Sequence, residues 1–191
     1  MKVIEQEIHS LKNSISEMWA LVHQQLYNAG EAMLTGDKEL AYKVISRERR
    51  VNAFELKIDS DCEDIIALYA PVAIDLRFVL AMYKINTNLE RLGDFAESIA
   101  RFAGNLPEGE PIDPQLVKET RVEEMLSELL SMISLTKEAF EKESSEIASR
   151  IFLKDNLIDE INHNSTAIIA KYIEEHKGSA LAGLYMAGVI R

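Results

Sequence analysis

The sequence predicts an all-α protein made of two helical bundles in tandem. Apolar residues recur at spacings of three and four along most of the 191 residues, which is the period of an amphipathic helix. Glycine and proline number only 8 and 4, which favours long elements over many turns. No stretch alternates apolar and polar residues for long enough to indicate a strand.

The first bundle is expected over residues 1–104, as three helices with apolar patterns at 4–33, 40–68 and about 75–102. The TGD stretch at 35–37 breaks the first pattern, and Asp37 can cap the next helix. Pro71 ends the second pattern, because a residue that precedes proline disfavours the helical conformation. Short antiparallel connections of this kind make a three-helix bundle.

Residues 105–114 are expected to be a linker, since this stretch is rich in proline and glycine. Residues 115–191 are predicted to form the second three-helix bundle, with patterns at 116–140, 147–172 and a short apolar 179–190. The stretch 44–55 resembles 151–162, which indicates a tandem duplication. Six helices are thus expected, the last one short, in an elongated molecule with its bundles end to end.

Composition excludes several classes of function. The net charge of −11 repels nucleic-acid phosphates and anionic lipid and attracts cations or a basic partner. Cys62 is the single cysteine, so no internal disulfide is possible and a reducing compartment is expected. The N-terminus lacks the apolar core of a signal peptide, and the longest apolar run is too short to cross a bilayer. A cytoplasmic protein without membrane insertion is therefore expected.

The stretch TNLERLGDFAES, residues 87–98, carries the candidate site. Glu90 and Asp94 lie four residues apart on one helix face, where like charges repel by about 0.2–0.5 kcal/mol. If the second and third helices are antiparallel around a turn near residue 72, six oxygen-bearing side chains lie at one level. They are Asn52, Glu55, Asp59, Asn86, Glu90 and Asp94. Oxygen ligands suit hard cations, so a metal site is predicted, and Gly93 allows a close approach to the helix.

The alternative is a solvated charged face whose acids pair with nearby arginines. The candidates for such pairing are Arg47, Arg49, Arg50 and Arg91. Cys62 is expected to be a buried packing residue, and Trp19 and Tyr27 core or interface anchors. No nucleophile lies near an obvious base and no glycine-rich phosphate loop is present, so no catalytic or cofactor-binding residue is assigned.

The run PVAIDLRFVLAMYKINTNLERLGDFAESIA resembles the signature of the PhoU family of phosphate-homeostasis regulators. The match comprises a proline, Asp75-Leu76-Arg77, and Asn88 to Asp94 about a dozen residues later. The helix before it, VISRERRVNAFELKIDSDC, is similar to the family's second helix. The resemblance is strong over 5–104 and weak over 115–191.

The resemblance implies two three-helix bundles, each with a Glu/Asp-x-x-x-Asp motif that binds metal, in some members as iron or zinc clusters. Here Glu90 to Asp94 is the first motif, and Arg77 would brace it. The ion could be iron, zinc, manganese or magnesium. The second motif is absent by Arg191, so the second bundle, with Asp155 and Asp159, looks truncated in its last helix.

The function that the resemblance implies is negative regulation of phosphate uptake and starvation signalling. Its partners would be the phosphate ABC transporter and a sensor histidine kinase, and the protein would be a homo-oligomer, such as a dimer, rather than an enzyme. Alternatives are the PhoU-like domain of a sodium–phosphate cotransporter, a carboxylate-bridged metalloenzyme and a metal-free scaffold. The Glu-x-x-His motifs of di-iron bundles are absent from the sequence, which disfavours the enzyme.

Overall fold

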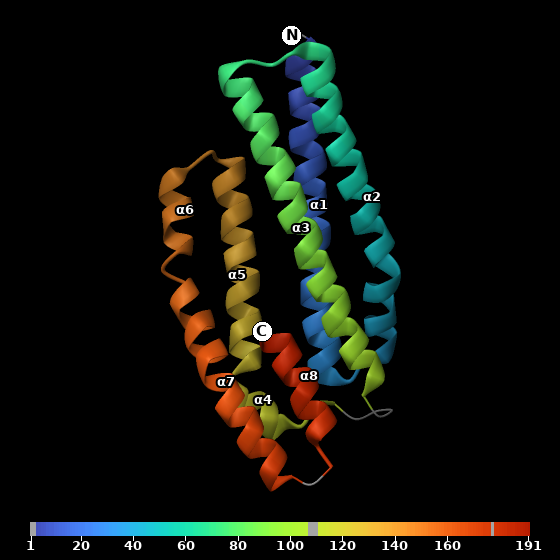
Figure 1. Cartoon of the computed structure of the whole chain (residues 1–191), viewed down its shortest axis with the longest axis vertical. Coiled ribbons are helices and arrows are strands. Elements are labelled where there is room, and N and C mark those ends of the chain that lie inside the picture. The colour runs from blue at the N-terminus through green and yellow to red at the C-terminus, as the bar shows by residue number, and fades with distance from the viewer. Residues whose placement is uncertain (1–2, 107–110, 177) are drawn as a thin grey trace.

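The computed structural model describes residues 3–106, 111–176 and 178–191. Every element in these ranges is an α-helix, which confirms the all-α prediction (Figure 1). The first group contains α1 (Val3–Thr35), α2 (Lys38–Tyr69) and α3 (Ala73–Asn105). The second contains α4 (Pro114–Thr120), α5 (Val122–Glu141), α6 (Ser145–Ile151), α7 (Asp155–Glu175) and α8 (Ala180–Ile190).

The boundaries of α2 lie at the residues that the sequence analysis expected to cap or end a helix. The carboxylate of Asp37 accepts a hydrogen bond from the backbone N–H of Leu40 at 2.9 Å and caps α2. Helix α2 ends at Tyr69, two residues before Pro71. The three helices pack on one another around a continuous apolar core. Its fully buried large side chains include Leu11, Ile15, Met18, Leu26, Met33, Ile58 and Met82.

Helices α2 and α3 approach each other closely at Gly93. A Cβ atom on Gly93 would lie only 2.8 Å from Cγ1 of Val51, which is closer than packed carbon atoms allow. Gly93 and Val51 are equally distant from residue 72. The antiparallel register expected from a turn near that residue is therefore the one observed.

The second half differs from the three helices expected there, because the described residues form five. The first break is at Arg121, whose backbone is left-handed (φ 57°). The second spans residues 152–154 between α6 and α7. Neither place carries glycine or proline, so no helix-breaking residue in the local sequence predicts these two breaks. Both are held by ion pairs to another helix: Arg121 to Glu160 at 2.8 Å, and Lys154 to Glu128 at 3.0 Å.

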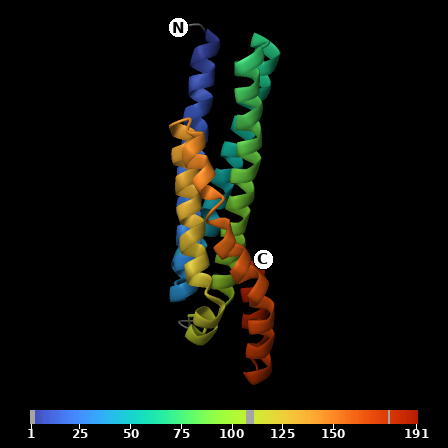
Figure 2. The same cartoon turned by 90° about the vertical axis from the view of Figure 1, so that its left-hand side faces the viewer.

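The two halves lie side by side over part of their length rather than end to end, and the molecule is elongated (Figure 1). Figure 2 shows α5 and α6 lying over α1, while α7 continues past the lower end of the first group. Trp19 of α1 stacks on Phe140 of α5 with ring centroids 5.7 Å apart, as an interface anchor should. Tyr27 is 46% exposed and is not an anchor, because its position faces solvent beside the core stripe of α1.

The predicted linker falls between the two groups. Helix α3 ends at Asn105 and α4 begins at Pro114, with Asp113 as its cap. Residues 107–110 of this linker lie outside the described ranges.

Candidate functional site

The predicted site residues lie along the contact between α2 and α3, on a strip that we call the acidic seam. Its members on α2 are Glu48, Asn52, Glu55 and Asp59, and those on α3 are Asn86, Glu90, Asp94 and Glu97. All six residues named from the sequence belong to it. The antiparallel packing of the two helices brings these side chains to one side of the first bundle, because their spacings of three and four repeat one helix face.

Asn86 is the fully buried member of the seam. Its side-chain amide donates to the backbone oxygen of Glu55 at 2.9 Å and to Oδ1 of Asp59 at 2.7 Å, so it ties α3 to α2. The amide oxygen of Asn86 is buried and has no hydrogen-bond partner among the residues that the structure describes. A buried acceptor without a partner costs about 1–3 kcal/mol, and a cation at this position would remove that cost.

The carboxylates of the seam raise one another's pKa values. Burial is the main cause at Glu90, and the negative charges of Asp94 and Glu55 add to it. Burial also raises the pKa of Glu55, with added repulsion from Asp59 and Asp94. The pKa of Glu48 is raised by burial and by Glu97 and Asp94, against a hydrogen bond from Asn52. Each of these shifts means that negative charge is disfavoured in the fold, which is the electrostatic condition that a bound cation would relieve.

The arginines do not neutralise the seam in the part of the chain that the structure describes. The single ion pair made by a seam residue there joins Glu97 to Arg101 at 2.6 Å. Arg50 instead lies over the ring of Phe54, 5.9 Å from its centroid. Arg77 does not brace the seam: it is exposed and precedes Glu90 by 13 residues, about 20 Å along α3. The solvated face neutralised by arginines is therefore not what the fold forms.

The seam is not a finished coordination shell. Within residues 3–106, 111–176 and 178–191, no three His, Cys, Asp or Glu side chains are already gathered closely enough to hold a metal ion. Glu55, Asp59 and Glu90 are half-buried and Asp94 is exposed, so their rotamers are not locked by packing. The donors suit a hard cation in kind, and binding one would require the carboxylates to turn inward toward Asn86.

Glu48 and Glu97 are the two seam residues that were not predicted from the sequence. Glu48 precedes Asn52 by four residues on α2, and Glu97 follows Asp94 by three on α3. Extending the same three-and-four spacing by one step in each direction would have found both.

The second half has no counterpart of the seam in its described residues. Asp155 and Asp159 match Glu48 and Asn52 in the repeat, but both are exposed near the start of α7. Helix α8 carries no acidic residue to face them.

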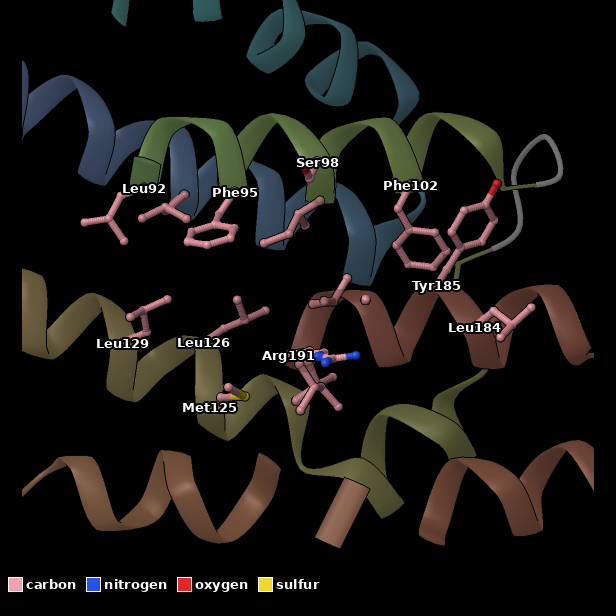
Figure 3. Close-up of a pocket in the computed structure, with 16 residues that line it drawn as sticks. Leu92, Phe95, Ser98, Phe102, Met125, Leu126, Leu129, Leu184, Tyr185 and Arg191 are labelled. Carbon is pink, nitrogen blue, oxygen red and sulfur yellow. The ribbon is translucent and has the colours of Figure 1, made fainter. Parts of the chain in front are cut away.

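A cavity of about 340 Å³ lies between the two halves and is chemically unlike the seam. Figure 3 shows Leu92 and Phe95 of α3 opposite Leu126 and Leu129 of α5. Tyr185 of α8 closes one end, 4.7 Å from the ring of Phe102. The lining is almost entirely apolar, so this cavity offers no metal ligands.

Cys62 is buried, and burial raises the pKa of its thiol to about 12, so it is a packing residue as predicted. None of the described helices combines the length and the apolar character needed to span a bilayer.

These observations define a class: an all-helical protein of two packed helical groups with an unneutralised acidic seam on the first. A family model described as the PhoU domain matches residues 15–103 and 122–191. A phosphate-specific transport system accessory protein PhoU homolog from Aquifex aeolicus is 32% identical over 97% of this chain and 82% of its own length. The PhoU accessory protein of Escherichia coli K12 is 32% identical over 95% of this chain and 75% of its own length.

Solved structures of PhoU proteins have the same fold as this chain. The phosphate transport system regulatory protein PhoU from Streptococcus pneumoniae superposes with a TM-score of 0.85 at 27% identity, over 98% of this chain and 86% of that one. PhoU from Pseudomonas aeruginosa gives a TM-score of 0.86 at 25% identity, over 98% and 88%. The chain belongs to the PhoU family.

Proposed function

We propose that this chain is an accessory and regulatory protein of a phosphate-specific transport system. It would act in the cytoplasm, as a homo-oligomer, and lower phosphate uptake and starvation signalling through contacts with the transporter and its sensor kinase. The carrying observation is the near full-length similarity to proteins with that accessory role in their names, at 32% identity over 97% of this chain. We assign the chain no catalytic residue.

The acidic seam is proposed to hold the metal of this regulator, whether iron, zinc, manganese or magnesium. Three observations support it: the buried amide oxygen of Asn86 lacks a partner, the pKa values of Glu55 and Glu90 are raised, and no arginine pairs with these two acids among the described residues. When bound, the ion would supply positive charge to the α2–α3 contact. Asn86, Glu55, Asp59, Glu90 and Asp94 would hold it, with Asn52 beside them.

Phosphate uptake tests the regulatory role. The chain is expressed in a bacterium that lacks its own PhoU-family gene, and radiolabelled phosphate uptake and a starvation-induced phosphatase are measured in phosphate-rich medium. We expect both to fall several-fold relative to an empty vector. Uptake and phosphatase that stay at the vector level, with the chain present in soluble form, would refute the regulatory role.

Elemental analysis tests the seam. Wild-type protein and the double variant Glu90→Ala/Asp94→Ala are purified after growth with added iron, zinc, manganese and magnesium. The variant should lose bound metal and the extra stability that the metal provides, about 2.7 kcal/mol at a free concentration of 100 Kd. The matched control is Asp155→Ala/Asp159→Ala, an exposed pair with the same spacing, which should keep the metal. Equal metal content in all three proteins would rule the seam out.

A further inference from the structure

The end of the first bundle that carries the α2–α3 turn projects beyond the second half. Helices α1 and α3 have 33 residues each and α5 has 20, and Figure 1 shows α5 and α6 ending well below this turn. Phe140 near the end of α5 lies at the level of Phe78 and Met82 in a shared cleft. The stretch from Val72 to Phe78, six steps of 1.5 Å along the helix, therefore projects by about 9–10 Å.

Large apolar side chains occupy this projecting end. Leu68, Val72 and Ile74, which we call the bundle tip, are 71%, 74% and 79% exposed. These three side chains come from both sides of one turn, and a contiguous exposed apolar patch indicates an interaction surface more strongly than a single exposed pair does. The turn itself has an unusual backbone, because Ala70 and Ala73 both adopt left-handed conformations (φ 43° and 49°) that alanine rarely takes.

The tip adjoins a cleft that extends its apolar surface. Ile74 lines this cleft of about 630 Å³ together with Phe78 and Met82 of α3, Ile8 of α1 and Phe140 of α5. The cleft exists because α5 ends there while α1 and α3 continue. An ion pair between Lys12 and Glu143, 2.9 Å long, lies at its border. The cleft is also lined by charged or titratable side chains, namely Glu5, His9, Lys12, Asp75 and Glu143. Tip and cleft together therefore form an apolar surface with a charged border.

The charged side chains near the tip indicate what kind of partner would bind there. Between residues 61 and 80 the acidic side chains are Asp61, Glu63, Asp64 and Asp75, and the single cation is Arg77. Asp61 pairs with Lys57, whereas Glu63, Asp64 and Asp75 are exposed. Asp64 lies one turn before Leu68 on the same face of α2. A complementary partner therefore carries basic side chains around an apolar pocket.

We propose that the bundle tip is the docking surface for a basic, apolar-pocketed cytoplasmic subunit of the transporter, which rests on the proposed function above. A second copy of the chain would bring the same acidic rim against itself in a two-fold contact, at a net charge of −11 per chain. An anionic membrane would be repelled by the same carboxylates. A basic protein partner satisfies both the apolar and the charged features.

Binding to the transporter tests the inference. The full chain is titrated onto the purified phosphate transporter complex in nanodiscs of zwitterionic lipid. The variant Leu68→Ser/Val72→Ser/Ile74→Ser should bind at least tenfold more weakly, with an unchanged thermal melt. The control Phe152→Ser/Leu153→Ser removes an equally exposed apolar pair from the second half and should bind as wild type does. Glu63→Gln/Asp64→Asn should weaken binding by two- to fivefold and flatten its salt dependence.

The outcomes separate the claims. Equal binding by the tip variant and wild type would overturn the docking surface and leave the proposed function standing. Failure of the wild type to bind the complex would overturn both. Loss of self-association by the tip variant in sedimentation velocity, or loss of flotation with phosphatidylglycerol vesicles, without loss of transporter binding, would assign the tip to a second copy or to a membrane instead.

Discussion

The two halves of the molecule use the same helical period but hold their helices together differently. In the first, three helices of 32 or 33 residues run unbroken and meet through a long apolar core. In the second half, the helices are interrupted at Arg121 and at 152–154. At each interruption a basic side chain forms an ion pair with a residue of another helix. The comparison indicates that a long continuous apolar face goes with an unbroken helix. Where the helices are short, polar side chains make the contacts between helices at the breaks.

The halves also differ in how they respond to acid. The raised pKa values of Glu48, Glu55 and Glu90 mean that protonation stabilises the first half. In the second half, the hydrogen bond from Tyr172 is the main cause of the lowered pKa of Asp113, so protonation destabilises that half. Mild acid should therefore strengthen one half while it weakens the other.

Trp19→Ala should have the largest effect on stability, because it removes the stacked contact that joins the halves. Trp19 is 5% exposed, and within the described part of the chain its indole N–H has no hydrogen-bond partner to lose. We expect the free energy of unfolding to fall by about 3–5 kcal/mol in urea titrations. Phe152→Ala, at an exposed position, should change it by less than about 0.5 kcal/mol. A loss below about 1 kcal/mol for Trp19→Ala would show that the stacking does not join the halves.

Gly93→Ala and Gly183→Ala compare close helix contacts in the two halves. At Gly93 a methyl group would press on the buried, β-branched Val51, and we expect a net loss of about 1–2 kcal/mol. At Gly183 it would lie 2.6 Å from both Cγ1 and Cδ1 of Ile173, which is closer still. Ile173 is only half-buried and has room to change rotamer, and the gain in helix propensity of about 1 kcal/mol should offset part of the clash. Thermal melts of both variants check this order. Equal losses would mean that the first half is no more tightly packed than the second.

Tyr172→Phe should weaken the second half by about 1 kcal/mol at neutral pH, since it removes a hydrogen bond to the carboxylate of Asp113. The folded-state pKa of Asp113 lies below its unfolded value, so this stabilisation is present above pH about 4 and disappears as pH falls further. Urea titrations of variant and wild type between pH 2 and 7 measure the difference. A difference that grows toward low pH would contradict the assignment.

Glu90→Gln should have the smallest effect and the opposite sign. In EDTA, the neutral amide relieves repulsion from Asp94 and Glu55, so stability at pH 7 should rise by about 0.2–0.5 kcal/mol. The folded-state pKa of Glu90 is raised, so the gain should vanish as pH falls toward 4. Glu97→Gln, which breaks the pair with Arg101, should show no such gain. Destabilisation by Glu90→Gln in EDTA would reveal a favourable partner for this carboxylate.

The sequence predicted the first half well because its helix ends carry local signals. Asp37 caps α2 with its own side chain, and Pro71 ends α2 through its own backbone. The antiparallel register of α2 and α3 follows from the position of the turn between them. The breaks at Arg121 and 152–154 could not be foreseen. The side chains that pair with Arg121 and Lys154 at these breaks, Glu160 and Glu128, lie 39 and 26 residues away in sequence.

The placement of the six named residues along one strip was predicted, but the full extent of the strip was not. The helical period placed the six named residues in one strip, and the same period would have added Glu48 and Glu97. The burial of Asn86 beside Asp59 depends on the closeness of the helices, which Gly93 permits. Spacing reports which face a side chain occupies, and only packing reports how deeply it lies. The bound metal stays a prediction.

The unequal lengths of the helices have a mechanical consequence. Because the first bundle extends about 10 Å past α5, a large molecule seated on its end would stand clear of α5 and α6. The flank formed by those two helices would then be open to another neighbour at the same moment.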